Sequence, residues 1–268
     1  MAPIPHHGVR LEIPIFGPES GVPAASAGAS RLELNHSGSY ALGGTTPTII
    51  ELSSLIFSLS HRNLTVPIRV MIRPRGAPSP VSSADPEPDF LYTHDELTAM
   101  RQDIIAFKES GLLDPQRGDG FVFGTLERDG ARLRINTEAN GEMVALARPL
   151  KCVFHRAFDD VLSSAEGVDG VAVWEEQAVE DLVACGFDGV LTSGGKGDVT
   201  VKGNVERLAR VVRGLRGRVE VVVGGGVRSG NVKGLKGGLG GGLRKCGFIL
   251  LVWLVWTVMG RGYLMRGR

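Results

Sequence analysis

The chain has 268 residues, 43% of them hydrophobic, which suffices for the core of one large barrel or of two small domains. Its formal net charge of +1 excludes the strong basic excess of proteins that bind nucleic acid or an anionic membrane surface. Three widely spaced cysteines, Cys152, Cys185 and Cys246, do not form a disulfide framework and are typical of a reducing cytoplasm.

The two ends of the chain carry the features that bear on targeting. The N-terminal sequence MAPIPHHGVR has no apolar core, so we expect no secretory signal. The longest apolar run, Phe248 to Trp256, has nine residues, whereas a bilayer-spanning helix needs about 20. We therefore expect a cytoplasmic protein without a membrane partner, and interpret this run as a buried strand or an aberrant tail.

Short apolar segments alternate with stretches of helical periodicity along the chain. The predicted strands are residues 10–16, 31–35, 68–74, 121–126, 151–158, 189–193 and 220–223. The predicted helices are residues 48–60, 94–111, 137–147, 177–185 and 204–215. Strands that alternate with helices predict a parallel sheet, because each crossover needs a helix to return the chain.

Seven such units favour an α/β fold of the TIM-like (β/α)₈ type over an open doubly wound sheet. An open sheet with a dinucleotide site would place GxGxxG after the first strand, and residues 17–22 (GPESGV) do not match it. The Pro-, Ser- and Asp-rich stretch 76–89 is predicted to be a loop.

Polar residues stand near the carboxyl ends of these predicted strands, where the ligands of a barrel bind. The catalytic candidates are Glu12, Glu33 and His155. The binding candidates are Asn35, Arg73, Arg75, Thr125, Arg156, Asp159 and Ser193, with the turn glycines Gly194, Gly225 and Gly226. Buried charges are costly unless they are paired, so these groups form either a polar pocket or structural ion pairs. Histidine titrates near neutrality and suits proton transfer, while arginines and glycine turns suit an anion.

Several motifs resemble one known family. They are AASAGASRLEL at 24–34, GGTTPT at 43–48, MIRPRG at 71–76, GFVFG at 120–124, FHRAFD at 154–159, LTSGG at 191–195 and GGVR at 225–228. In this order and across residues 10–231 they resemble the CutC copper homeostasis family. The resemblance implies a TIM-like barrel, a cytoplasmic location and a role in copper tolerance or copper binding, with copper as the ligand.

The chain departs from the family pattern at the end of the second strand. Members often carry Cys there, and this chain has Asn35. Copper(I) prefers thiolate and thioether ligands, so the residue types leave the metal ligands unassigned.

The second departure begins at residue 232, where a Gly-rich, basic and apolar tail replaces the last βα unit. Residues 221–268 hold eight Lys and Arg and no acidic residue. Seven of the fourteen residues 234–247 are glycine, each costing a helix about 1 kcal/mol relative to Ala. We predict a barrel domain over 1–231 and a tail over 232–268, with the eighth unit missing or degenerate. Residues 248–256 either replace its strand or leave an exposed apolar segment, for which we expect aggregation. A changed reading frame or a retained intron is our hypothesis for the tail, and a transcript that encodes it in an expressed protein would contradict it.

Three functions follow from these patterns. The first is a copper homeostasis protein that binds or handles copper ions. The second is a barrel enzyme acting on a small anionic or phosphorylated metabolite, with His155 as general acid or base. The third is an inactive product of a damaged gene. Whether the chain is an enzyme and whether it forms a homo-oligomer are left open.

Overall fold

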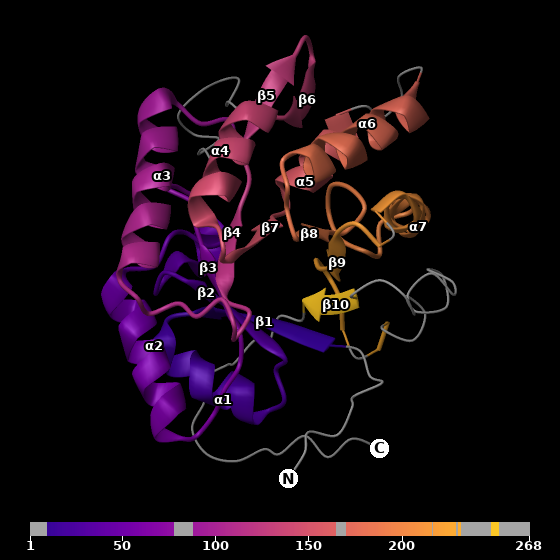
Figure 1. The fold of residues 1–268 in the computed structure, drawn as a ribbon. Coiled ribbons are helices and arrows are strands. Elements are labelled where there is room, and N and C mark those ends of the chain that lie inside the picture. Colours follow the sequence, from indigo (N-terminus) through magenta and orange to yellow (C-terminus); the bar gives the residue numbers. More distant parts are fainter. Residues whose placement is uncertain are drawn as a thin grey trace.

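The computed structural model describes residues 10–77, 88–164, 170–215, 217–228 and 230–231, and the backbone of a strand at 248–251. Eight parallel strands close into a barrel in the order β1-β10-β9-β8-β7-β4-β3-β2 (Figure 1). They are β1 (Arg10–Phe16), β2 (Arg31–Asn35), β3 (Ile68–Met71), β4 (Gly120–Phe123), β7 (Lys151–Phe154), β8 (Gly189–Thr192), β9 (Glu220–Val223) and β10 (Phe248–Leu251). The predicted TIM-like barrel is confirmed.

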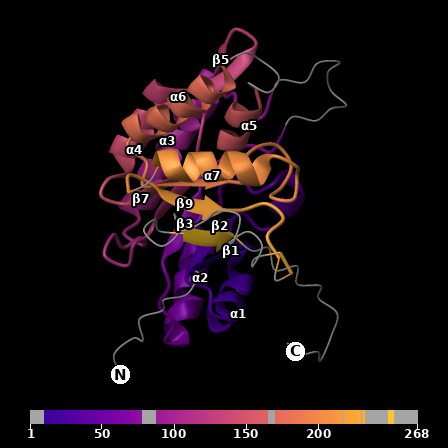
Figure 2. The same cartoon turned by 90° about the vertical axis from the view of Figure 1, so that its right-hand side faces the viewer.

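Helices surround this barrel. They are α1 (Gly21–Ser26), α2 (Ile49–His61), α3 (His94–Glu109), α4 (Thr137–Ala147), α5 (Ala157–Ser164), α6 (Val171–Ala184) and α7 (Asn204–Leu215), with short 3₁₀ turns η1 (Pro18–Ser20) and η2 (Ser39–Leu42). Capping boxes fix where α2 and α3 begin, because Thr48 and Thr93 each exchange hydrogen bonds with a glutamate three residues later. Figure 2 shows α7 lying over β9, with β10 and β1 next along the barrel wall. In the described residues no helix is long and apolar enough to cross a membrane.

The interior of the barrel has an apolar middle layer. Because side chains alternate along a strand, every second residue points inward. Five of these form a buried cluster contributed by five strands: Met71, Val122, Val153, Leu191 and Val222. The other face of each strand packs under the helices in a larger core. The middle layer therefore divides the barrel into a carboxyl end and an amino end, each lined by polar groups.

Some predicted bounds differ from the observed ones. The third strand ends at Met71 rather than 74, since the Arg73 N–H donates to Thr46 Oγ1 instead of a neighbouring strand. The fifth predicted strand, 151–158, is wrong beyond Phe154, because α5 begins at Ala157. Helix α6 begins at Val171, six residues before the predicted start.

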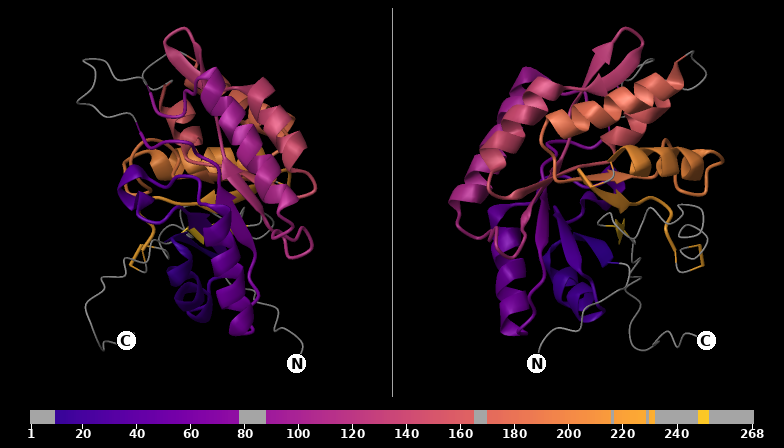
Figure 3. Two further views of the ribbon diagram at one scale, coloured as in Figure 1. Left: turned by 90° about the vertical axis from the view of Figure 1, so that its left-hand side faces the viewer. Right: turned by 45° about the vertical axis from the view of Figure 1, so that its right-hand side comes forward.

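A hairpin that the sequence analysis did not predict projects from the barrel. It consists of β5 (Leu126–Asp129) and β6 (Arg132–Ile135), paired antiparallel. Figure 3 shows it beyond the helices, and β6 packs against α5 and α6.

The eighth strand position is filled by β10. It pairs in parallel with β9 on one side and with β1 on the other, so neither strand is left as an open edge. The predicted replacement strand is confirmed for its first four residues, and the rest of the tail lies outside the described residues, as do residues 78–87 of the predicted loop. The boundary at residue 231 stays a prediction.

Candidate functional site

A cavity of about 470 Å³ opens at the carboxyl end of the barrel. Five of the residues predicted for the site line it together: Glu33, Arg73, His155, Arg156 and Asp159. They come from β2 and from the segments that follow β3 and β7, as expected for strand ends that converge on one mouth. The sequence-based expectation of a polar pocket at this end agrees with this geometry.

Glu33 is a buried acid without an ionic partner in the cavity. Its side chain is 4% exposed, and Asn35 Nδ2 donates to Glu33 Oε1 over 3.2 Å. Among the described residues, Glu33 Oε2 has no hydrogen-bond partner. Burial, reinforced by repulsion from the Glu12 carboxylate, raises the pKa of Glu33 to about 8. Glu33 is therefore mainly protonated near neutral pH and can donate a hydrogen bond or a proton.

His155 is held as a neutral imidazole. Burial and the nearby positive charge of Arg73 lower the pKa of His155 to about 3. The Ala157 N–H lies 3.3 Å from His155 Nδ1 and donates to it, while Nε2 has no partner in the part of the chain that the structure describes. The Phe90 ring packs on the imidazole with centroids 4.5 Å apart. Gly124 permits this placement, because a Cβ there would lie 3.0 Å from Nδ1.

Arg73 ties the segment after β2 to the cavity wall. Its guanidinium donates to the carbonyl oxygens of Leu42 and Gly44 over 2.6 and 2.7 Å, and pairs with Asp89 over 2.7 Å. Arg73 Nε remains without a partner. The two Nη groups of Arg73 therefore hold the cavity wall together, and the Nε–H can donate to a ligand.

Asp159 organises the turn after β8. It accepts hydrogen bonds from Thr192 Oγ1 over 2.6 Å and from the N–H groups of Ser193 and Gly195 over 3.0 and 3.1 Å. Arg156 Nε pairs with Asp159 over 2.7 Å. Asp159 and Ser193 thus have their hydrogen-bonding capacity occupied by protein groups.

The glycine turns are less available to an anion than the sequence analysis expected. The Gly194 N–H donates to Thr192 Oγ1 over 2.9 Å. A Cβ at Gly225 would meet the Arg156 guanidinium, and one at Gly226 would meet Asp198. Gly194, Gly225 and Gly226 are not among the residues that line the cavity, and their role as anion ligands stays a prediction.

Three further candidates lie away from the cavity. Glu12 faces the barrel interior and pairs with Arg31. Arg75 donates to Glu96 Oε1 over 2.6 Å on the outer side of the wall. Thr125 is buried, and its backbone exchanges two hydrogen bonds with the Asn140 side chain.

The structure adds residues that the sequence analysis missed. Met71, Asp89, Phe90, Asp160 and Lys196 also line the cavity. Met71 could have been found, because it lies two residues before Arg73 and shares its phase on the strand. Asp89 and Phe90 close an irregular loop, where no periodic pattern marks an inward residue.

The described cysteines do not contribute to this cavity. Cys152 and Cys185 are free and buried, and burial raises the pKa of each thiol to about 12. They are therefore neutral thiols rather than metal-binding thiolates. Within the described ranges, no group of three or more His, Cys, Asp and Glu side chains is arranged to hold a metal ion.

Comparison with known proteins gives one consistent family. The model of the CutC family matches residues 9–241. The copper homeostasis protein cutC homolog of Homo sapiens is 34% identical over 234 residues, covering 87% of this chain and 71% of that protein. The family protein CutC of Vibrio cholerae is 33% identical over 225 residues, covering 83% and 73%. A CutC crystal structure from Streptococcus agalactiae has the same fold, with a TM-score of 0.68 at 24% identity over 91% of this chain and 98% of that one.

Proposed function

Because this chain belongs to the CutC family, we propose that it acts in copper homeostasis and binds copper ions in the cavity at the carboxyl end of the barrel. The names of the human and mouse relatives support the copper homeostasis role. We further propose a cytoplasmic location, which the free thiols of Cys152 and Cys185 support.

One observation carries the copper proposal: a thioether and a neutral imidazole line the same cavity, those of Met71 and His155. Copper(I) favours soft sulfur ligands and also accepts imidazole. The low pKa of His155 keeps the imidazole neutral. Because Nδ1 accepts from the Ala157 N–H, the ring proton lies on Nε2 and has to move to Nδ1 or leave when Nε2 binds the metal. These two side chains take the place of the thiolate that Asn35 cannot provide.

The test is an anaerobic titration of the folded chain with copper(I) against a competing chelator. We expect one bound copper ion per chain, and a loss of at least about tenfold in affinity for Met71→Leu, a substitution that nearly conserves volume. The matched control is Cys152→Ala, which removes a buried sulfur outside the cavity and should bind as the wild type does. Unchanged binding by Met71→Leu, or no binding by the folded wild type, would overturn the proposed site.

A second candidate is an enzyme that acts on a small anionic metabolite in the same cavity. It is favoured by three buried polar atoms there that have no partner among the described residues: Glu33 Oε2, Arg73 Nε and His155 Nε2. In this reaction Glu33, protonated near neutral pH, would supply the proton, and His155 would donate a hydrogen bond from Nε2. Arg156 and Lys196 add positive charge at the cavity wall.

Turnover of a panel of small phosphorylated and carboxylated metabolites, followed by NMR, tests the enzyme candidate. Activity that is lost in Glu33→Gln and kept in Cys152→Ala would support it. Copper binding without turnover of any member of the panel would reject the enzyme candidate and retain the copper proposal.

A further inference from the structure

A second cavity, of about 380 Å³, opens at the opposite, amino end of the barrel. Its lining includes the first residues of β1, β2, β7 and β9, namely Arg10, Arg31, Lys151 and Glu220. The apolar middle layer of the barrel separates this cavity from the carboxyl-end cavity. The two cavities are therefore separate openings, although Arg31 at the amino end acts electrostatically on Glu33 at the carboxyl end.

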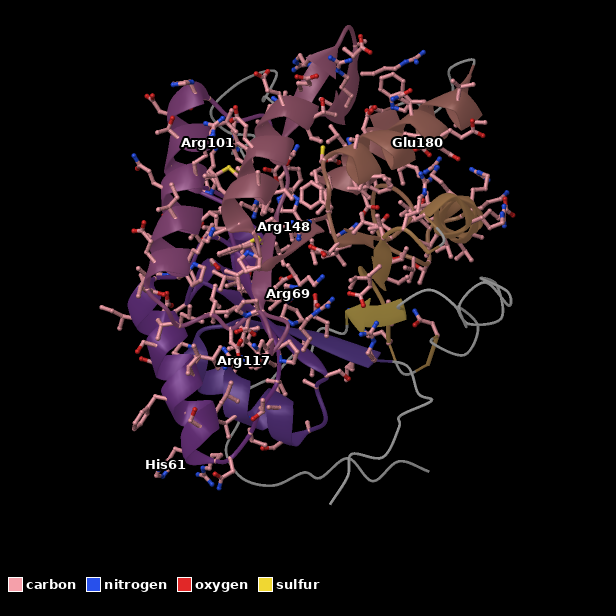
Figure 4. All side chains as sticks on the ribbon, viewed as in Figure 1. His61, Arg69, Arg101, Arg117, Arg148 and Glu180 are labelled. Atoms are coloured by element: carbon pink, nitrogen blue, oxygen red, sulfur yellow. The ribbon has the colours of Figure 1, made fainter. Side chains whose placement is uncertain are left out.

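Positive charge dominates the lining of the amino-end cavity. Five cations face two carboxylates there: Arg10, Arg31, Arg69, Arg117 and Lys151 against Asp188 and Glu220. Arg69 and Arg117, both labelled in Figure 4, come from β3 and from the loop before β4. Such an excess of guanidinium groups in a concave site attracts anions.

Four of these cations have a carboxylate partner. Arg10 and Arg31 both pair with Glu220, the latter over 2.8 Å, and Arg31 also pairs with the buried Glu12. Lys151 pairs with Asp188 over 2.8 Å. Arg117 pairs with Asp119. These ion pairs stabilise the fold, which is the usual role of residues at the amino end of such a barrel.

Arg69 is the exception. Its side chain donates to the carbonyl oxygen of Gly118, and among the described residues no carboxylate lies within ion-pair distance of it. Arg69 is only 5% exposed, and no described residue is a hydrogen-bond partner of its Nε. Arg31, also 5% exposed, keeps Nη2 without a partner. The carboxylates of Glu12, Glu220 and Asp119 act on Arg69 only from beyond ion-pair distance. A buried guanidinium without a carboxylate in contact is costly, and a bound anion would reduce that cost.

The charge state of Arg69 is compatible with such a role. Burial, and next the positive charge of Arg31, lower the pKa of Arg69 to about 10. The side chain therefore stays protonated at neutral pH, in a field that already contains an excess of positive charge.

We propose that the amino end of the barrel is a binding site for a phosphate group, held by Arg69 and Arg31. Guanidinium groups match phosphate oxygens with paired N–H donors. The cavity has the size of a small-molecule site, so inorganic phosphate and a phosphorylated metabolite both fit this chemistry. This site is distinct from the proposed copper cavity and does not depend on the function proposed for it.

The test is isothermal titration of the full chain with inorganic phosphate and with glycerol phosphate, at constant ionic strength in chloride. We expect one phosphate group bound per chain and at least a tenfold loss of affinity in Arg69→Met. Equal affinity for the two ligands would indicate that the site binds inorganic phosphate itself. Tighter binding of glycerol phosphate would indicate that the site binds a phosphorylated metabolite.

The matched control is Arg101→Met, which removes an arginine of α3 that lines neither cavity and should leave phosphate binding unchanged. Arg10→Gln is a second test on a rim residue whose loss should not affect folding. It leaves Glu220 with one cation fewer, so we expect at least threefold weaker binding. Absence of binding by the folded wild type, or binding that is abolished by Arg101→Met and not by Arg69→Met or Arg10→Gln, would overturn the proposal.

Discussion

Glu33 is expected to destabilise the fold at neutral pH, so replacing it by the neutral isostere in Glu33→Gln should stabilise the chain. In the folded state its pKa is about 8, against 4.5 for an ordinary glutamate. An unfolded chain therefore gains free energy by ionising Glu33 at pH values where the folded chain keeps it protonated. At about pH 7 this difference corresponds to about 3 kcal/mol, from about 1.4 kcal/mol per pH unit above 4.5.

The sign of the pH dependence follows from this raised pKa. Below pH 4.5 both states are protonated and Glu33 contributes nothing. Between pH 4.5 and about 8 the wild type loses stability as the pH rises, because only its unfolded state ionises Glu33. Glu33→Gln lacks this loss and can still accept from Asn35, so we expect it to be about 1–3 kcal/mol more stable near pH 7 and equal near pH 4.

Urea denaturation followed by circular dichroism across this pH range measures the effect. The control is Glu175→Gln, which removes a buried carboxylate that pairs with Arg207 and Arg210 and should destabilise the chain by about 1–3 kcal/mol. The two substitutions should thus change the free energy of unfolding near pH 7 in opposite directions. A Glu33→Gln variant less stable than the wild type near pH 7 would refute the assignment of Glu33 as a buried, protonated acid.

Three other substitutions test the framework of the barrel. Gly120→Ala would place its Cβ 1.9 Å from the Lys151 carbonyl oxygen, so β4 and β7 must separate and we expect a loss of about 3 kcal/mol in thermal unfolding. Thr93→Ala removes the cap that accepts from the Glu96 N–H, which should cost about 1 kcal/mol in urea denaturation. Asp159→Asn weakens the hydrogen bonds that hold the turn after β8, and the amide hydrogen of Gly195 should then exchange measurably faster.

The sequence predicted the barrel well because its strands are short, buried and separated by helices. Residues 10–16, 31–35 and 220–223 form strands with the predicted bounds. The errors occur where an apolar run crosses from one element into the next. In the segment 151–158, Phe154 ends β7 and Phe158 lies in α5, and both are buried, so hydrophobicity alone cannot locate the boundary.

A turn signal for the missed hairpin was present in the sequence. Gly130 and Ala131 connect the two strands, because Asp129 pairs with Arg132, and glycine at the first position of a two-residue loop is typical of a tight β-hairpin. The hairpin has one exposed side, which is why its residues are more polar than those of the barrel strands.

The candidate site was predictable only in part. Strand phase and strand end located Glu33, Arg73 and His155 at one mouth. Their protonation was not predictable, because the pKa values of Glu33 and His155 depend on burial and on Glu12 and Arg73, which only the folded chain brings near them. The amino-end arginines also escaped notice, since strand starts are not where barrel ligands are usually sought.

The position of β10 has a consequence for synthesis on the ribosome. β1 is made first, yet one of its two neighbours is β10, the last strand of the barrel to be made. Until that segment leaves the ribosomal tunnel, β1 and β9 each present an unsatisfied backbone edge. Closure of the barrel therefore waits for residues 248–251, and a nascent chain stalled before Phe248 should be a preferred substrate for chaperones.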